Sequence, residues 1–392
     1  MDPVRNGGFA AVEDEPMKIA MIVPGGVDRG GERRVIPCLL WVIERLAREH
    51  EVHVFALRQE PRPCTYGLLG AAIHVAGARP RRLRLLGQFA REHRRSPFDA
   101  IHARWAAPPG VLAAILGRVF GIPVLLRLTG GDMASIPAIR YGQRRTWRGR
   151  LWLRLAVRGA SHITVPSASM QRSAKELGIR AERLPWGVAT DRWPPLPPRP
   201  RDANRPARLI WVGTLNRVKN PEMLLRTAQI LRARECRFRL DVIGEDTRGG
   251  EIQRMAGELG LDDSVRFRGF LTQAELRAEM AAADLLLLTS WHEADPVVLF
   301  EAASAGVPAA GAAVGHLIDW APEAAFAVPV NDADALADAV SLALSDDPLR
   351  IRVAEAAQRR ALDEDCDRCV RRLNEIYRSL AGREPSAFAA RP

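Results

Sequence analysis

A short, unbroken apolar run at residues 285–289 is the feature that most restricts the fold of this chain. A run of this length predicts a strand that is buried on both faces, as in a parallel sheet. Such a strand needs a crossover helix before its next neighbour. Asp295 and Pro296 predict the start of that helix, as N-cap and first helical residue, and Gly306 predicts its end. The segment therefore favours a parallel α/β sheet.

Two carboxylates flank this predicted helix start. Glu293 precedes the helix and Glu301 lies on it. Ligands of open α/β sheets bind beyond the carboxyl ends of the strands, where the first N–H groups of a helix, here near Val297 and Val298, attract anions. We interpret one glutamate as a partner for sugar hydroxyls and the other as a partner for a nucleoside ribose. The alternative is that both are solvated surface acids.

The rest of the chain alternates predicted strands with predicted helices, which indicates doubly wound parallel sheets. Strands are expected at residues 17–24, 51–57, 72–75, 99–102, 124–128 and 161–166, and again at 208–212, 239–243 and 265–270. A proline-rich stretch separates the two sets and suits an extended connection. The predicted organisation is α/β with two Rossmann-like domains: a polar, disordered leader (1–16), an N-terminal domain (17–193), a linker (194–207), a C-terminal domain (208–380) and a tail (381–392).

Two loops at predicted strand ends are suited to anions. Gly30 and Gly31 close a glycine-rich turn between the first strand and the first helix. Arg217 and Lys219 occupy the loop after the first strand of the second domain, just before Pro221. Lys219 is one of only three lysines among 57 basic residues. We therefore expect both loops to face phosphate groups.

The spacing of Glu293 and Glu301, with seven residues between them and Gly306 and Gly315 following, resembles a known signature. It is similar to that of the retaining GT-B-fold glycosyltransferases of family 4 (group 1), which include sucrose synthases and bacterial mannosyltransferases. The resemblance spans roughly residues 17–380. It implies two domains facing a cleft, and a retaining, metal-independent transfer of a hexosyl group from a nucleotide-diphosphate sugar. That sugar is a co-substrate, and no cofactor or metal is expected.

The resemblance also assigns roles to residues. Lys219 falls on the family's lysine that grips the donor diphosphate, whereas Thr214 replaces its arginine, and we expect Arg217 to compensate. Glu293 is expected to orient the transferred sugar and Glu301 to hold the ribose. The expected donor site comprises Gly30, Gly31, Arg217, Lys219, Gly244, Arg268, Phe270, Asp295, Val297, Val298 and Glu301.

One departure from the family concerns the catalytic centre. Relatives often place a histidine near the transferred sugar, where this chain has Thr129. His102 is predicted to end its own strand and to reach the same crevice, so we consider it, with Glu293, a catalytic candidate. The alternative is a hydrogen-bonded structural histidine. Asp132 is expected to face the acceptor.

The uneven charge of the chain bears on its partners. Residues 1–195 carry 31 Lys and Arg against 16 Asp and Glu, a net charge of +15. Arg150, Arg154 and Arg158 recur at helical spacing before Gly159. We expect a carbohydrate or glycolipid acceptor, and peripheral contact between this helix and an anionic membrane. A solvated basic face is the alternative. No run is long enough to cross a membrane.

Two rival functions remain compatible with the pattern. The basic half could belong to a non-catalytic protein that binds a polyanion or nucleic acid, although no nucleic-acid motif is present and none is expected as a partner. A degenerate glycosyltransferase acting as a scaffold would share the fold without activity. Five scattered cysteines favour a reducing, cytoplasmic location, at most peripheral at the inner membrane face. Their one CxxC pair is not expected to bind a metal.

Overall fold

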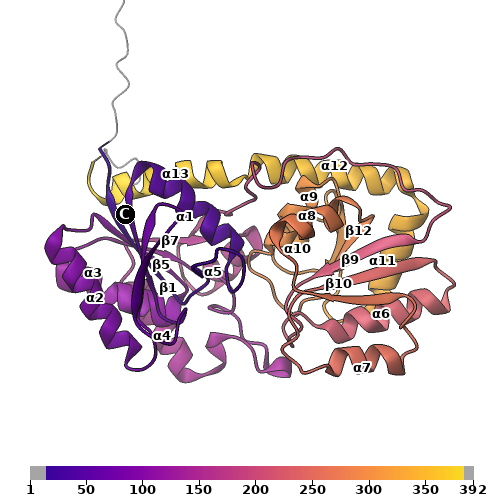
Figure 1. The fold of residues 1–392 in the computed structure, drawn as a ribbon, viewed down its shortest axis with the longest axis horizontal. Helices are drawn as coiled ribbons and strands as arrows, with labels where there is room; N and C mark the ends of the chain where they lie inside the picture. The colour runs from indigo at the N-terminus through magenta and orange to yellow at the C-terminus, as the bar shows by residue number, and fades with distance from the viewer. Residues whose placement is uncertain (1–14, 384–392) are drawn as a thin grey trace, which may run out of the picture.

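The computed structural model describes residues 15–383 and contains two sheets in two domains (Figure 1). The predicted leader (1–16) and tail (381–392) lie almost wholly outside the described residues. None of the helices in residues 15–383 combines the length and the apolar character that crossing a bilayer would require.

The N-terminal sheet has eight strands. Their spatial order is β3 (Cys64–Leu68), β4 (Ala71–Val75), β2 (Glu51–Ala56), β1 (Lys18–Val23), β5 (Ala100–Arg104), β6 (Val124–Arg127), β7 (His162–Val165) and β8 (Glu182–Arg183). All pairings are parallel except that of β3 with β4. The sequence analysis missed β3 and β8, which extend the two edges of the sheet.

The helices of this domain begin after the strands, as expected. They are α1 (Pro37–Glu49), α2 (Arg81–Arg95), α3 (Val111–Phe120), α4 (Trp147–Arg158) and α5 (Ala168–Glu176), with single turns at Ala106–Gly110, Pro137–Ile139 and Gln143–Arg145. The chain leaves β1 for β2 on one side and returns to β5 on the other. The carboxyl ends of β1 and β5 therefore form the topological switch point, where open α/β sheets bind ligands.

The C-terminal sheet has six parallel strands with an analogous order. They are β11 (Val265–Gly269), β10 (Phe238–Ile243), β9 (Ala207–Val212), β12 (Leu285–Leu288), β13 (Ala309–Ala312) and β14 (Phe326–Val328). The helices are α6 (Pro221–Ala233), α7 (Glu251–Glu258), α8 (Gln273–Ala281), α9 (Val297–Ser304), α10 (His316–Trp320), α11 (Ala333–Ser345) and α12 (Asp347–Asp363). Its switch point lies between β9 and β12.

The run at residues 285–289 folds as predicted, into the central strand β12 with every residue buried. Gly306 follows α9 with φ +71°. A Cβ at this glycine would lie 2.6 Å from the carbonyl oxygen of Leu196, because the proline-rich segment packs against the end of the helix. The Leu196 N–H also donates to Ser304 O at 2.9 Å. The predicted linker is therefore bound to the second domain along its course.

The last helix, α13 (Cys366–Leu380), packs against α1 of the N-terminal domain (Figure 1). Arg45 on α1 pairs with Asp367 at 2.5 Å and with Asp191 at 2.7 Å. The final helix of the range 208–380 therefore crosses back to the first domain. Sequence periodicity alone cannot show this crossing, because the apolar face of a helix does not identify the element against which it packs.

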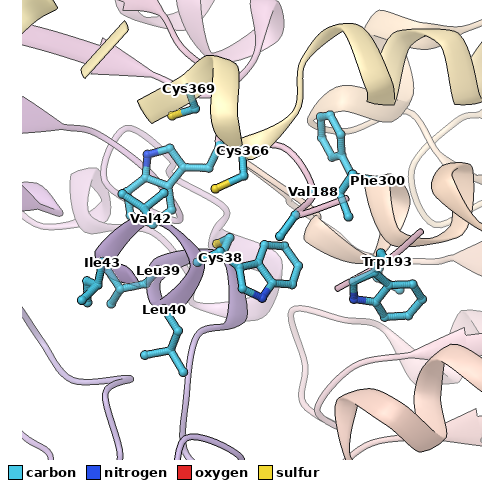
Figure 2. Packing of buried hydrophobic residues seen from close by; sticks show 14 of the residues in the cluster. Cys38, Leu39, Leu40, Val42, Ile43, Val188, Trp193, Phe300, Cys366 and Cys369 are labelled. Carbon is cyan, nitrogen blue, oxygen red and sulfur yellow. The ribbon is translucent and has the colours of Figure 1, made fainter. Parts of the chain in front are cut away.

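One apolar core runs between the two domains at this crossing. Figure 2 shows Cys366 and Cys369 of α13 close to Cys38 and Leu39 of α1, with Trp193 and Phe300 leading toward the second domain. The lone CxxC is thus buried in the first turn of α13. Within residues 15–383, no group of His, Cys, Asp and Glu is arranged to hold a metal ion.

Candidate active site

Lys219 and Glu293 meet at the switch point of the C-terminal sheet. The Lys219 ammonium donates to Glu293 Oε1 at 2.5 Å, and the Ser290 hydroxyl donates to the same oxygen at 2.6 Å. Lys219 follows β9 and Glu293 follows β12, and these strands are neighbours. The two residues, 74 positions apart, are brought together because parallel strands end at one edge of the sheet.

Loop hydrogen bonds hold Lys219 in this position. The Asn216 side chain accepts from the backbone N–H of Val218 and Lys219, at 3.0 and 3.1 Å. The Thr289 hydroxyl donates to the Lys219 carbonyl at 2.9 Å, which joins the loop to the end of β12. Arg217, at the tip of the same loop, is exposed and has no hydrogen bond or ion pair to any described residue. Its guanidinium is therefore free to meet an anion.

The start of α9 differs from the sequence prediction. The helix begins at Val297 with Pro296 as its N-cap, and no side chain caps it. The prediction that Asp295 is the N-cap is wrong by one residue, because the Asp295 carboxylate is engaged elsewhere. The first-turn N–H groups of Val297 and Val298 consequently lack a side-chain acceptor, and they lie close in sequence to Glu293.

Asp295 instead pairs with a residue of the other domain. Its Oδ2 lies 2.7 Å from Nη2 of Arg127, the last residue of β6, and its Oδ1 lies 3.2 Å from His316 Nε2. Arg127 is fully buried and Asp295 is 5% exposed. Burial opposes ionisation of Asp295, but the His316 hydrogen bond and the Arg127 charge outweigh it and lower the pKa to about 2. Asp295 thus joins the domains and is not free to contact a donor.

Glu301 is a buried acid with an unused oxygen. It is 3% exposed, and its Oε1 has no hydrogen-bond partner. Burial raises the pKa of Glu301 to about 8, although a hydrogen bond from Gln273 opposes the shift. A buried carboxyl with an unpaired oxygen is costly, which suggests a ligand group that completes it.

Gln273, the hydrogen-bond partner of Glu301, lines a crevice between the domains. This cavity of about 620 Å³ is lined by Gly30 and Gly31 from the N-terminal domain and by Thr272 and Gln273 from the C-terminal domain. The predicted glycine turn therefore faces the second domain across this cavity, and its contact with the donor phosphates stays a prediction.

Three other predicted donor residues lie at the outer strands. Gly244, with φ +141°, has its Cα so near β9 that an added Cβ would lie 2.0 Å from Gly213 O. Arg268 is engaged by Glu279 at 3.0 Å and by Asp241 at 3.4 Å, and its place in the donor site stays a prediction. Phe270 lies under the guanidinium of Arg33 from the other domain, 4.8 Å from the ring centroid.

His102 does not lie where the sequence prediction placed it. It occupies the middle of β5, not its end, and is 1% exposed. Its Nδ1 lies 2.7 Å from the hydroxyl of Tyr377 on α13. Burial, with the neighbouring charges of Arg127 and Arg104, lowers the pKa of His102 to about 3. The alternative interpretation, a hydrogen-bonded structural histidine, fits this geometry.

Sequence reasoning missed His292, which lies next to the position where relatives have their histidine. His292 Nε2 lies 2.8 Å from the carbonyl oxygen of Gly130, directly after Thr129, and its ring lies 5.8 Å from that of Tyr141. His292 immediately precedes Glu293, so adjacency to the predicted site was the available signal. Asp132 is 4% exposed and its Oδ2 accepts the Thr129 N–H at 3.0 Å. Burial, opposed by that hydrogen bond, raises the pKa of Asp132 to about 7.

Comparison with known proteins adds family evidence to this geometry. Residues 197–360 match the family "Glycosyl transferases group 1", and residues 35–185 match "Glycosyl transferase 4-like domain". The chain is 33% identical over 180 residues to D-inositol 3-phosphate glycosyltransferase of Salinispora arenicola, covering 43% of this chain and 40% of that protein. The aligned region thus spans less than half of this curated relative.

Solved structures resemble the whole fold. Sucrose-phosphate synthase from Thermosynechococcus elongatus has a TM-score of 0.79 at 20% identity, covering 94% of this chain and 100% of that one. Anabaena HepE in complex with UDP-glucose has a TM-score of 0.71 at 17% identity, covering 93% and 100%. The predicted GT-B arrangement of two Rossmann-like domains is confirmed. With one family match on each domain, the chain belongs to the group 1 glycosyl transferases.

Proposed function

We propose that the protein transfers a hexosyl group from a nucleotide-diphosphate sugar to a carbohydrate or lipid-linked acceptor. The observation that carries this proposal is the contact between Lys219 and Glu293 at 2.5 Å, beside an uncapped helix start. The names of the similar proteins support it: the relatives are called D-inositol 3-phosphate glycosyltransferases, and HepE was solved in complex with UDP-glucose.

In the proposed reaction, breaking the bond to the anomeric carbon leaves a diphosphate whose negative charge grows. Lys219, Arg217 and the N–H groups of Val297 and Val298 can stabilise that charge without rearranging during the step. Glu293, whose Oε1 accepts from Lys219 and Ser290, orients the sugar with its other oxygen. Glu301 accepts hydrogen bonds from the ribose hydroxyls. We propose retention of the anomeric configuration and independence of metal ions, since the cationic groups perform the role that a metal would have.

The test is a donor assay on the full chain. Incubation with UDP-glucose, and with other nucleotide sugars in parallel, is expected to release nucleoside diphosphate slowly, and proton NMR of any transferred or hydrolysed sugar should show the α-anomer first. Activity should persist in a chelator. A first-formed β-anomer would exclude retention, and absence of binding to every nucleotide sugar would refute the donor site. A scaffold protein of the same fold would bind without turnover.

We further propose that the N-terminal domain contacts an anionic membrane at the inner membrane face. Within residues 15–383, seven of the eleven exposed large apolar side chains lie on α2, α3 and α4: Leu83, Ile115, Val119, Trp147, Leu151, Trp152 and Leu155. The α2 and α3 helices lie at the end of this domain that faces away from the second domain (Figure 1). Beside α4, a cavity of about 430 Å³ is lined by Arg144, Arg150, Arg154 and Arg158. Aromatic and apolar groups interleaved with arginine suit a lipid interface.

Vesicle flotation tests this second proposal. Binding should require anionic lipid and weaken as salt rises. Trp147→Ala combined with Leu151→Ala should reduce it, whereas Leu342→Ala, an equally exposed leucine on α11 of the other domain, should not. Equal loss in both variants, or binding to neutral vesicles alone, would contradict the assignment of this face.

A further inference from the structure

The guanidinium of Arg104 is buried at the carboxyl end of a central strand. Arg104 is the last residue of β5, at the switch point of the N-terminal sheet, and is 7% exposed. Its Nε and Nη1 are buried and have no hydrogen-bond partner. Among the described residues, no ion pair involves it either. This arginine is not used by the donor site or by the domain contact.

Its neighbour on the next strand, Arg127, has a counter-ion in the same environment, although the Arg127 Nε is also without a hydrogen-bond partner. Arg104 and Arg127 are paired in register on β5 and β6, and both guanidiniums lie over the ring of Trp186, at 4.7 and 4.4 Å from its centroid. Arg127 donates to Asp295 at 2.7 Å and to Leu184 O at 2.6 Å. Of the two arginines, Asp295 thus pairs with Arg127 alone, and the charge of Arg104 is left without a counter-ion.

The surroundings of Arg104 place it on the acceptor side. Asp132 is close enough for the Arg104 charge to lower its pKa, yet its Oδ2 accepts from Thr129 N–H and it forms no ion pair with Arg104. Tyr141 lies within electrostatic reach of both Asp132 and Glu293, which connects this group to the sugar-orienting glutamate. Trp105, next to Arg104, holds φ +78° and ψ 143°, a strained conformation of the kind found at binding sites.

A buried guanidinium without a partner is strongly unfavourable, because its lost hydration is not repaid by hydrogen bonds or by a counter-charge. Such a group persists where a ligand supplies the missing charge. We propose that Arg104 binds an oxyanion, a phosphate or a carboxylate, carried by the acceptor of the transfer reaction. The assignment of the anion to the acceptor rests on the proposed function, whereas the binding of an anion by Arg104 rests on the geometry alone.

The experiment uses thermal unfolding of the full chain with inorganic phosphate as the probe, at constant ionic strength against chloride. Saturating UDP is added in one arm, so that the donor diphosphate position is filled, and omitted in the other. Phosphate should raise Tm in both arms. Arg104→Met should abolish this shift, weakening phosphate binding by at least about tenfold, while leaving the dissociation constant of UDP unchanged. Arg104→Lys should retain part of the shift.

The matched control is Arg118→Met, an exposed arginine on α3, which should keep the full phosphate shift. Without ligand, Arg104→Met should unfold at the wild-type temperature or above it, because an apolar side chain replaces an unpaired buried charge. A lower Tm would mean that the guanidinium is structural, and would overturn the proposal. No phosphate shift in the wild type, or an intact shift in Arg104→Met, would overturn it as well.

The remaining outcomes separate the two proposals. If Arg104→Met weakens UDP binding by tenfold or more, the anion is the diphosphate of the donor, and the acceptor assignment is wrong. If the wild type binds phosphate through Arg104 but binds no nucleotide, the proposed function fails while the oxyanion site stands. Finally, an anionic sugar such as glucose 6-phosphate should compete with inorganic phosphate, whereas glucose should not; equal competition would refute charge recognition.

Discussion

Donor binding should depend on pH through Glu301. In the ligand-free protein the pKa of Glu301 is about 8, because the carboxyl is buried, so most molecules hold a proton there at pH 7. Ribose hydroxyls that donate to this group favour its carboxylate form. Binding must therefore release the proton, at a cost of about 1.4 kcal/mol per pH unit below the pKa. The affinity at pH 7 should be roughly tenfold below its high-pH limit, and at pH 6 roughly a hundredfold.

The assay is isothermal titration with UDP-glucose between pH 6 and 9, in two buffers of different ionisation enthalpy. At pH 7 nearly one proton should be released per ligand bound. Glu301→Gln keeps the shape of the side chain and cannot titrate, so its affinity should be independent of pH in this range. A flat wild-type profile, or a slope that survives in Glu301→Gln, would refute the role of Glu301. Because this acid has a raised pKa in the folded state, the ligand-free protein should also lose stability as pH rises from about 4.5 to 8.

Three further predictions concern the site and its frame. Lys219→Ala should weaken UDP-glucose binding by about 10- to 150-fold, measured by titration, because one charge-assisted contact is lost. Arg217→Ala should also weaken binding, and an affinity within twofold of the wild type would show that Arg217 is not part of the donor site. Asp295→Asn should lower stability by about 2–5 kcal/mol at pH 7, because Arg127 loses its buried counter-charge. Asp338→Asn, which breaks an exposed ion pair with Arg234, should leave stability almost unchanged. Because the Asp295 pKa is depressed to about 2, the stability difference between the wild type and Asp295→Asn should disappear as pH falls from 4 toward 2. Gly244→Ala should lower Tm sharply, since its Cβ would lie 2.0 Å from Gly213 O, whereas Gly87→Ala, in open space on α2, should raise Tm slightly.

The sequence predicted those site residues whose positions follow from the sheet itself. Lys219 and Glu293 come directly after neighbouring parallel strands, and Gly30 and Gly31 come after the first strand of the other domain. Their convergence at strand ends follows from the topology alone. His102 shows the limit of this reasoning. An error of two residues in the end of β5 moved it from the middle of a strand to the crevice, where its chemistry would have been entirely different.

The residues that escaped prediction depend on how the two domains face each other. Arg127 ends an apolar strand and carries no sequence pattern that points to Asp295, 168 positions away. His292 resembles any polar loop residue until Gly130 of the other domain is placed beside it. Local rules favoured Asp295 as an N-cap, and the buried charge of Arg127 overrode them. Leaving the Arg127 guanidinium buried without its counter-charge would cost about 3–5 kcal/mol, more than a cap worth about 1 kcal/mol.

The two cross-domain contacts of His292 and Asp295 come from one short segment, residues 292–295. His292 reaches the Gly130 carbonyl and Asp295 meets Arg127, while Glu293, between them, meets Lys219 of its own domain. Glu293, which we propose orients the donor sugar, is therefore held between two contacts to the N-terminal domain. If the domains separated, both contacts would break and Arg127 and Asp295 would have to be hydrated or paired anew. The geometry around Glu293 is thus complete only when the domains are closed, which couples sugar positioning to exclusion of water from the cleft.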